Sequence, residues 1–512
     1  MKTILAYDLG TGGNKASLYT EEGECLDAVF VSYDTLYPQA GWHEQRPADW
    51  WDAVVESTRR LLASGKASPE SVECLAVSGH SLGCVPLDGS GKLLRETTPI
   101  WSDRRSENQA CAFFEKVDPG DWYLKTGNGF PAPHYTVFKT MWYRDNEPGM
   151  FDAIDKIIGT KDYVNYRLTG RVSTDFSYAS GCGAYNLTDW AYDEELVEAS
   201  GLPRGLLPEI VPSTEILGTL TRNAAEALGL PRTIKVACGG VDNSCMALGA
   251  RNIGEGCVYA SLGSSAWIAV CSGRPLLEGR SKPYVFAHVI PRMFTSAMAI
   301  FSSGSSFRWV RDHVCPDLAE TAVRSGADVY DLMTELAQKS SPGAKGMLFN
   351  PSLAGGSSLD ASPHIRGALL GLDLGHTRED IIRAAMEGIA LNMRIVLDEL
   401  RALCPVAEEM IAVGGSSRSA FWRSMFADAL DIRIVKTNVG QEAGSLGAAA
   451  VAAVAAGLWP DFSRIAEVHR VDDVSEPGPE NKAVYESLLP VFRQAAESQA
   501  QLGDALHALG DA

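Results

Sequence analysis

The chain has 512 residues, well beyond the roughly 250–300 at which a single hydrophobic core stops growing, so two large domains are expected. Hydrophobic residues make up 46% and charged residues 21%, a composition that excludes a disordered or fibrous protein. The formal net charge of −19 excludes a broad nucleic-acid or anionic-membrane surface, because both require a basic footprint.

The eleven cysteines occur singly, without a Cys-x-x-Cys pair or a Cys/His cluster at zinc spacing. This usage predicts neither a disulfide framework nor a structural metal site, and it fits a reducing cytoplasm. The chain enters a strand-like pattern at once, and no stretch reaches the roughly 18–20 apolar residues of a membrane span. The sequence therefore predicts a cytoplasmic protein that is neither secreted nor anchored.

The first predicted element is a strand hairpin. Thr3 to Tyr7 is an apolar run, residues 8–13 form a glycine-rich turn, and Lys15 to Tyr19 resumes the alternation. The turn is neither a P-loop nor a dinucleotide fingerprint, because both of those patterns must open a helix. Its backbone N–H groups can still converge on phosphate oxygens, with Thr11 adding a hydroxyl and Asp8 a magnesium ligand. An ordinary hairpin is the alternative.

Two loops of the first half are candidate substrate contacts. Cys74 to Val77 predicts a buried strand that ends near His80, on a polar loop of the kind where α/β proteins form ligand sites. A structural histidine is the alternative there. In the second loop Trp101 can pack against the carbon face of a polyhydroxylated ligand while Asp103 and Arg105 hydrogen-bond its hydroxyls. The alternative for Asp103 is the cap of a helix that begins in this segment.

The stretch Gly239-Gly240-Val241-Asp242-Asn243 lies almost at the midpoint of the chain. An apolar run from Ile234 to Cys238 leads into the two glycines, and small residues from Ser244 to Ala250 predict a helix. Asp242 therefore lies at a strand end, where a carboxylate is well placed to take a proton from a substrate hydroxyl. The alternative is an Asp that only caps the helix.

The second half repeats the layout of the first. Gly256 to Cys271 predicts a strand, a turn and a returning strand, as Ile4 to Tyr19 does. Later, Met410 to Val413 predicts a strand, two glycines follow, and Ser419 to Leu430 predicts a helix with apolar residues at helical spacing. A strand, two glycines and a helix N-terminus form a corner that can accept a nucleotide.

Five short motifs occur in one order along the chain. They are Asp-Leu-Gly-Thr at 8–11, Trp-x-Asp-x-Arg at 101–105, Gly-Gly-x-Asp-Asn at 239–243, Ser-Leu-Gly-Ser at 261–264 and Gly-Gly-Ser-Ser at 414–417. Together they resemble the FGGY family of carbohydrate kinases. The resemblance implies an α/β fold of two domains, of the actin/hexokinase-like (ribonuclease H-like) ATPase type, with an interdomain cleft.

The resemblance also implies roles for particular residues. Residues 1–248 would form the sugar-binding domain, and residues 249–512 the ATP-binding domain, with a helical tail from about residue 460. Asp242 would be the catalytic base. The implied sugar contacts are His80, Ser81, Leu82, Trp101, Asp103, Arg105, Asp242 and Asn243. The implied ATP contacts are Asp8, Thr11, Gly12, Gly13, Lys15, Gly263, Ser264, Gly304, Gly414, Gly415, Ser416 and Ser419, with Mg²⁺ at Asp8.

Within the family the chain is most similar to the xylulokinases, through residues 41–47 and Lys161-Asp162-Tyr163. Xylulokinases usually carry Gln-Met-His-Gly in the first substrate loop, whereas this chain has His80-Ser81-Leu82-Gly83. We expect ATP-dependent phosphorylation of a ketopentose, with ribulose, erythrulose, erythritol, glycerol and gluconate as alternative substrates. A nucleotide-driven switch without phosphotransfer is the alternative of another class. The expected partners are a small sugar or polyol and a second copy in a homodimer, without nucleic acid or membrane.

Overall fold

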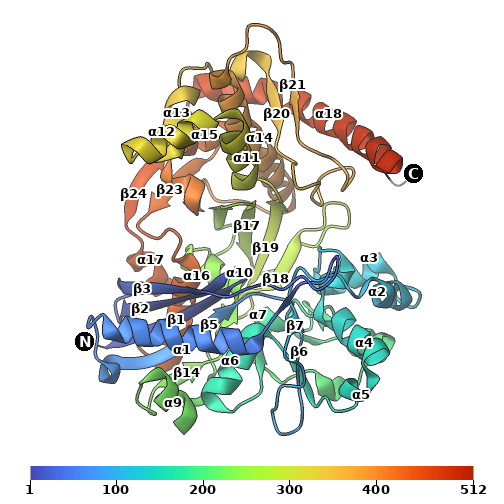
Figure 1. Cartoon of the computed structure of the whole chain (residues 1–512), viewed down its shortest axis with the longest axis vertical. Coiled ribbons are helices and arrows are strands. Elements are labelled where there is room, and N and C mark those ends of the chain that lie inside the picture. Colours follow the sequence, from blue (N-terminus) through green and yellow to red (C-terminus); the bar gives the residue numbers. More distant parts are fainter. Residues whose placement is uncertain (1, 511–512) are drawn as a thin grey trace. The chain divides into compact units, whose positions relative to one another are not determined.

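The structure is a computed structural model that describes residues 2–510 (Figure 1). The chain divides into two compact α/β units. Unit 1 contains the chain up to Glu255 together with Cys271–Ser296 and Glu442–His469. Unit 2 contains Gly256–Val270, Ala297–Gln441 and the chain from Arg470. Two segments from the second half of the chain return to unit 1, so these units are interleaved and do not follow one division at residue 248/249.

The sheet of unit 1 has the strand order β13-β14-β5-β1-β2-β3, with β15 beside β5. Its strands are β1 (Thr3–Gly10), β2 (Gly13–Thr20), β3 (Cys25–Ser32), β5 (Val72–Gly79), β13 (Ile216–Thr219), β14 (Lys235–Ala237) and β15 (Gly240–Val241). β1 pairs antiparallel with β2 and parallel with β5. The predicted hairpin and the predicted buried strand are both confirmed.

Helices cover this sheet on both faces. Leu5, Tyr7 and Leu9 of β1 belong to the core cluster that includes Trp50 of α1 (Pro47–Ala63). Because side chains alternate along a strand, Asp8 faces the other side, where a Cβ at Gly444 of α16 (Ala443–Ala456) would lie 2.5 Å from Asp8 Oδ2. Gly444 of α16 therefore allows this helix to pack closely against β1.

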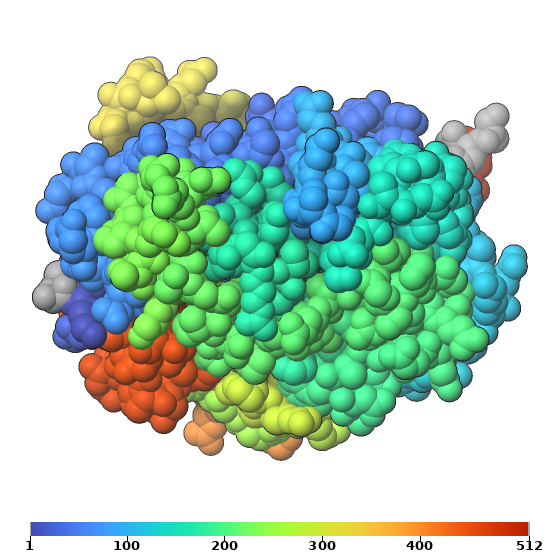
Figure 2. Space-filling model, turned by 90° about the horizontal axis from the view of Figure 1, so that it is seen from below, coloured from blue at the N-terminus to red at the C-terminus, as the bar shows by residue number. Residues whose placement is uncertain are grey.

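The returning segment Glu442–His469 is tied to the first strands of unit 1. Ser17 Oγ donates to Ser445 Oγ at 3.1 Å, and Trp459 Nε1 donates to the Glu21 carbonyl at 2.7 Å. Figure 2 shows this segment, coloured orange-red, at the surface of the molecule. The site residues on β1 are thus supported by chain that follows them by more than four hundred residues.

Unit 1 contains further helices and strands outside this sheet. They are β4 (Glu44–Gln45), β6 (Val85–Leu87), β7 (Thr98–Pro99), α2 (Glu107–Phe114), α3 (Pro119–Thr126), α4 (Thr136–Asn146), α5 (Pro148–Phe151), β8 (Lys156–Ile158), α6 (Thr160–Thr169), β9 (Thr174–Asp175), α7 (Phe176–Ala179), β10 (Tyr185–Asn186), β11 (Ala191–Tyr192), α8 (Glu194–Ser200), β12 (Ile210–Val211), α9 (Arg222–Leu228), α10 (Asp242–Gly249), β18 (Tyr284–Ala287) and α17 (Ile465–Val468). The helix expected to begin within residues 101–105 begins later, at Glu107. Asp103 does not cap it, because both of its carboxylate oxygens accept hydrogen bonds from Arg105 and His43.

The sheet of unit 2 contains the neighbouring strands β17-β16-β22-β23-β24. The strands are β16 (Val258–Leu262), β17 (Ala266–Ser272), β19 (Phe294–Ile300), β22 (Glu409–Val413), β23 (Arg433–Thr437) and β24 (Val471–Ser475), with β20 (Leu348–Asn350) paired to β21 (Ala368–Leu370). β16 pairs antiparallel with β17 and parallel with β22. The second half therefore has the hairpin layout that the sequence predicts.

The helices of unit 2 are α11 (Gly304–Val314), α12 (Pro316–Ser325), α13 (Val329–Ala337), α14 (Arg378–Leu403), α15 (Ala420–Leu430) and α18 (Pro479–Gly510). The chain beyond residue 460 is not a purely helical tail. β24 pairs antiparallel with β23 and extends the sheet before α18 begins. Within residues 2–510, no helix is both long enough and apolar enough to cross a membrane.

Candidate active site

The glycine turn that leads to Asp242 lies against β5. Gly240 of β15 pairs in parallel with Ser78. Gly239 has a φ of +74°, and a Cβ there would lie 2.0 Å from the Val77 carbonyl oxygen. Only glycine fits this backbone conformation and this close approach. The two glycines thus bring the chain to the edge of the sheet where β1 and β5 also end.

Asp242 is the first residue of α10 rather than its cap. Val241 occupies the N-cap position, and its side chain makes no cap hydrogen bond. The Asp242 carboxylate is partly buried and accepts a hydrogen bond from the backbone N–H of Asn243 at 2.8 Å. The capping alternative is therefore wrong, and the carboxylate keeps acceptor capacity for a ligand.

Asp8 lies on β1 with Lys15 opposite it on β2 and Ser78 opposite it on β5. Ser78 Oγ donates to Asp8 Oδ1 at 2.7 Å. Burial raises the pKa of Asp8, while the hydrogen bond and the charge of Lys15 act against that rise. Burial and then the charge of Asp8 raise the pKa of Asp242 to about 7. A carboxyl group with such a pKa can exchange a proton near neutral pH.

Thr11, Gly12 and Gly13 form the tip of the first hairpin. Thr11 Oγ1 accepts a hydrogen bond from Trp101 Nε1 at 2.9 Å, which joins a predicted phosphate contact to a predicted sugar contact. A Cβ at Gly13 would lie 2.5 Å from the Val31 carbonyl oxygen, whereas a Cβ at Gly12 would have nothing within 4 Å. Gly12 therefore faces open space, and Gly13 is a packing requirement.

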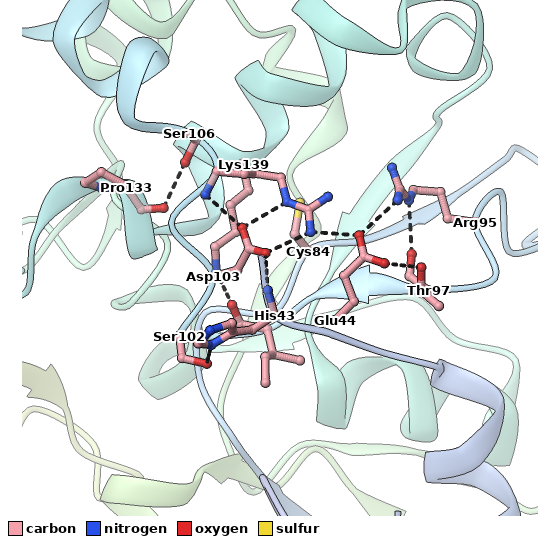
Figure 3. A network of polar contacts seen from close by, with 12 residues as sticks. His43, Glu44, Cys84, Arg95, Thr97, Ser102, Asp103, Ser106, Pro133 and Lys139 are labelled. Atoms are coloured by element: carbon pink, nitrogen blue, oxygen red, sulfur yellow. Dashed lines mark hydrogen bonds and ion pairs between the residues drawn. The ribbon is translucent and has the colours of Figure 1, made fainter. Parts of the chain in front are cut away.

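Asp103 and Arg105 form a buried ion pair. Figure 3 shows Asp103 within a network of polar contacts that also contains Glu44 and Lys139. Arg105 Nε and Nη2 donate to the two Asp103 oxygens at 2.9 and 2.8 Å, and Nη2 lies 2.7 Å from Glu44 Oε1. The guanidinium carbon also lies 4.0 Å from the centroid of the Trp42 ring. Both side chains are 0% exposed. These contacts brace the loop, and a direct contact of either residue with sugar stays a prediction.

His80 is also buried. Its ring packs edge-on against Trp50, with the ring centroids 5.5 Å apart, and Thr160 Oγ1 lies 3.2 Å from its Nδ1. Burial lowers the pKa of His80 to about 4, so the ring is neutral at physiological pH. Ser81 beside it is half-buried, and a sugar contact of either residue stays a prediction.

Leu82 belongs to a core cluster, and its backbone φ is +60°, a strained value for a side chain with a Cβ. Its carbonyl oxygen accepts a hydrogen bond at 3.0 Å from Lys139 Nζ. Lys139 also donates to the Ile100 carbonyl at 2.6 Å, and burial lowers its pKa to about 8. Lys139 therefore holds the two candidate sugar loops together.

Unit 2 contains a cavity of about 580 Å³ at the carboxyl end of β16. Six of the seven predicted nucleotide contacts of this unit line the cavity, and they are Gly263, Ser264, Gly304, Gly415, Ser416 and Ser419. Phe307, Tyr330 and Trp422 line it as well, with Arg308 and Arg418 as its cations. Glycine backbone, hydroxyls, aromatic rings and arginines together suit a nucleotide.

Gly414, the seventh predicted contact, is not among the lining residues. It has a φ of +95°, and a Cβ there would lie 2.7 Å from the Leu262 carbonyl oxygen, so it shapes the turn. Gly415, the next residue, faces open space. Ser419 caps α15 and accepts a hydrogen bond from the Trp422 N–H at 3.3 Å. The strand, glycine turn and helix start are therefore confirmed.

Comparison with known proteins identifies the family. The family model for the N-terminal domain of FGGY carbohydrate kinases matches residues 3–249, and the model for the C-terminal domain matches residues 258–456. The chain belongs to the FGGY family of carbohydrate kinases. It is an ATP-dependent sugar phosphotransferase with a two-domain α/β fold. Family membership favours this kinase prediction over the alternative of a nucleotide-driven switch.

The FGGY kinase has relatives with different named activities. It is 26% identical to the xylulose kinase of Bacillus subtilis, over 99% of each chain. It is 29% identical to the gluconokinase of Bacillus licheniformis, over 96% of this chain and 94% of the relative. Among solved structures, xylulose kinase from Rhodospirillum rubrum matches with a TM-score of 0.87 and 26% identity, over 98% of this chain and 100% of that one.

The sequence does not predict the buried residues that lie beside Asp8 and beside the Asp242 turn. Gly444 leaves room for the Asp8 carboxylate, and Lys161, Asp175 and Ser177 form a buried polar chain next to the Asp242 turn. The signals in the sequence are the xylulokinase-like motif that contains Lys161 and the polar residues that interrupt apolar runs in these segments. Spacing alone does not show that they lie beside residues 238–242.

Proposed function

We propose that this kinase transfers the γ-phosphoryl group of ATP to a hydroxyl of a ketopentose, with D-xylulose as the first candidate. The observation that carries the proposal is Asp242, a carboxylate with a pKa of about 7 at the end of a rigid glycine turn. Asp242 accepts the proton of the sugar hydroxyl as that hydroxyl attacks phosphorus. A base with a pKa near the working pH is efficient at such a transfer.

ATP occupies the cavity of unit 2 in this proposal. The backbone N–H groups of Ser264 and Gly415 hold phosphate oxygens, and Arg308 and Arg418 supply positive charge. Phosphoryl transfer depends mainly on such positioning and charge stabilisation. The interdomain cleft that the sequence predicts stays part of the proposal.

Asp8 would hold Mg²⁺. Its carboxylate is a hard oxygen donor, and the absence of a side chain at Gly444 leaves room for that carboxylate. Within residues 2–510 no group of three or more acidic, His or Cys side chains could hold a metal ion. Mg²⁺ commonly binds through one or two carboxylates and the substrate phosphates, so this sparse set fits it. When bound, the ion would neutralise charge on the phosphates.

Two buried cations favour a neutral sugar over an acidic one. Arg105 is paired with Asp103 and Glu44, and Lys139 donates to two backbone carbonyls. Neither is free to bind the carboxylate of an aldonic acid. Gluconate is nevertheless the second candidate, because gluconokinases are as similar to this chain as xylulose kinases are.

The test of the base is Asp242→Asn. We expect this variant to fold and to bind ATP as the wild type does, while sugar phosphorylation falls by about 10²–10⁴-fold. A coupled assay of ADP release measures turnover, and nucleotide titration measures ATP binding. Unchanged turnover in the variant would contradict the proposal.

The test of the substrate is a panel assay with ATP. D-xylulose, L-xylulose, ribulose, erythrulose, erythritol, glycerol and gluconate are compared by kcat/KM. We expect the highest value for a ketopentose. A high value for gluconate alone would identify a gluconokinase, and a high value for glycerol alone would also refute the ketopentose proposal.

A further inference from the structure

A chain of buried polar groups lies behind the Asp242 turn. It begins at Lys161, near the start of α6, whose Nζ lies 2.5 Å from Asp162 Oδ1 and 3.0 Å from Asp175 Oδ1. All three side chains are at most 1% exposed. The positive charge of Lys161 offsets the cost of burying the two carboxylates, since a buried charge needs a partner of opposite charge.

The chain continues from Asp175 to the turn through one hydroxyl group. Ser177 Oγ donates its proton to Asp175 Oδ2 at 2.5 Å. Because the only proton of this hydroxyl points at Asp175, its lone pairs face away, and one of them accepts the Val241 N–H at 2.9 Å. Val241 is the residue immediately before Asp242. The orientation of Asp175 is therefore transmitted to the residue that precedes the proposed base.

The other end of the turn is held by the same network. The Cys238 carbonyl accepts hydrogen bonds from Asn165 Nδ2 at 2.7 Å and from Lys161 Nζ at 3.4 Å. Between these two anchors, Gly239 is pressed against the Val77 carbonyl. The turn is thus fixed before Gly239 by Lys161 and Asn165, and after Gly240 by Ser177.

We propose that Ser177, oriented by Asp175 and Lys161, is a positioning residue that sets the place of the Asp242 carboxylate for proton transfer. This inference rests on the proposed function, in which Asp242 is the base. Ser177 does not touch the sugar in this proposal, and its loss moves the base rather than a binding group. A misplacement of about 1 Å at a reacting group can reduce the rate by about 10²-fold.

The chain offers a matched control for a purely structural role. Ser213 Oγ donates to the same oxygen, Asp175 Oδ2, at 2.8 Å, and it is buried as Ser177 is. Its hydroxyl, however, has no hydrogen bond to residues 239–242 in the described structure. Both serine-to-alanine changes remove one hydrogen bond to Asp175, and only Ser177→Ala also removes the acceptor of the Val241 N–H.

The experiment compares Ser177→Ala and Ser213→Ala in full-length protein, with ATP and the best sugar of the panel. We expect Ser177→Ala to lower kcat by about 10- to 100-fold while the KM values for ATP and sugar change less than threefold. Ser213→Ala should keep kcat within about twofold. Thermal melts establish that both variants fold. If Ser177→Ala does not fold, Ser177→Cys replaces it in the same comparison, because its thiol is only a weak hydrogen-bond acceptor.

Other outcomes separate this inference from the proposed function. Equal kcat values for the two alanine variants, or a loss confined to KM, would overturn the positioning role of Ser177. If Asp242→Asn is inactive while Ser177→Ala turns over like the wild type, only the inference fails. If Asp242→Asn keeps its activity, the proposed base itself is wrong.

Discussion

The hairpin β1–β2 of unit 1 and the hairpin β16–β17 of unit 2 have the same layout with different chemistry. In each, the first strand pairs antiparallel with the second and parallel with a later strand, β5 or β22. Asp8 of the first hairpin and Ser261 of the second begin the matching motifs. Unit 1 thus presents a carboxylate where unit 2 presents a neutral hydroxyl.

The residues paired with Asp8 and Ser261 on the neighbouring strands also differ in polarity. Asp8 lies between Lys15 and Ser78, which partly offset the burial of its charge. Ser261 lies between Trp267 and Val413, which offer no such compensation. The two units therefore share a backbone layout, and their side chains differ as the proposed function requires, with metal and proton chemistry proposed for unit 1 and nucleotide binding for unit 2.

The largest expected effect comes from one glycine in the turn before Asp242 and one in the turn after β22, Gly239 and Gly414. Both have a positive φ, and an alanine Cβ would lie 2.0 Å from a carbonyl oxygen at position 239 and 2.7 Å from one at position 414. We expect Gly239→Ala to abolish activity and lower the melting temperature, and Gly414→Ala to do so less severely because its contact is longer. Activity assays and thermal melts measure both effects.

Controls for these substitutions exist in both units. A Cβ at Gly12 or at Gly415 would meet nothing within 4 Å. Alanine at either position should leave the melting temperature unchanged within error. If these controls are as damaging as Gly239→Ala, close approach to the backbone is not the reason for the glycines.

The second prediction concerns Asp8→Asn, which makes unit 1 resemble unit 2. Asp8 raises the pKa of Asp242, so removing its charge lowers that pKa from about 7. Because the base acts in its deprotonated form, activity rises with pH through this pKa, and the acidic limb of kcat/KM should move to lower pH. Turnover should also fall about tenfold or more, as expected for a lost positioned charge.

A pH profile of kcat/KM from about pH 5 to 9 brackets that pKa and checks the shift. Asp52→Asn, on the exposed face of α1, is the control and should leave the limb in place. An unshifted limb in Asp8→Asn would mean that the two carboxylates do not interact.

The third prediction concerns Lys139→Met, which keeps the apolar stem and removes the ammonium group. Two buried carbonyls, those of Leu82 and Ile100, would lose their donor, at about 1–3 kcal/mol for each unsatisfied group. We expect the KM for sugar to rise about tenfold or more and the KM for ATP to stay unchanged, since both loops belong to unit 1. An equal rise in both KM values would contradict a role limited to the sugar loops.

The elements that sequence alone predicts are those with local causes. Alternating apolar residues define the hairpin of β1 and β2, which the sequence predicts from Thr3 to Tyr19. The sequence also predicts turns at Gly239 and Gly414, because a turn of this kind depends on glycine itself. Local signals thus locate both candidate ligand sites.

Errors arise where a distant partner decides the structure. Asp103 was a candidate helix cap, yet its hydrogen bond to the His43 N–H joins residues 60 positions apart. Residues 471–475 were assigned to a helical tail, yet their pairing with β23 makes them a strand. The chain from Lys161 to Val241 was missed for the same reason, since spacing carries no information about contacts between separate elements.

The smallest expected effect distinguishes the helix starts of the two sites. Helix α10 begins at Asp242 without a side-chain cap, whereas Ser419 caps α15 through the Trp422 N–H. Ser419→Ala should therefore lower the free energy of unfolding by about 1 kcal/mol, the usual loss for a removed cap. Because Ser419 and Trp422 both line the cavity of unit 2, the KM for ATP should rise severalfold while the KM for sugar stays constant.

Denaturant titration and steady-state kinetics measure these changes. The control is Val241→Ala, at the N-cap position of α10, which should leave the KM for ATP as it is in the wild type. A higher KM for sugar in Ser419→Ala would contradict the assignment of nucleotide binding to unit 2.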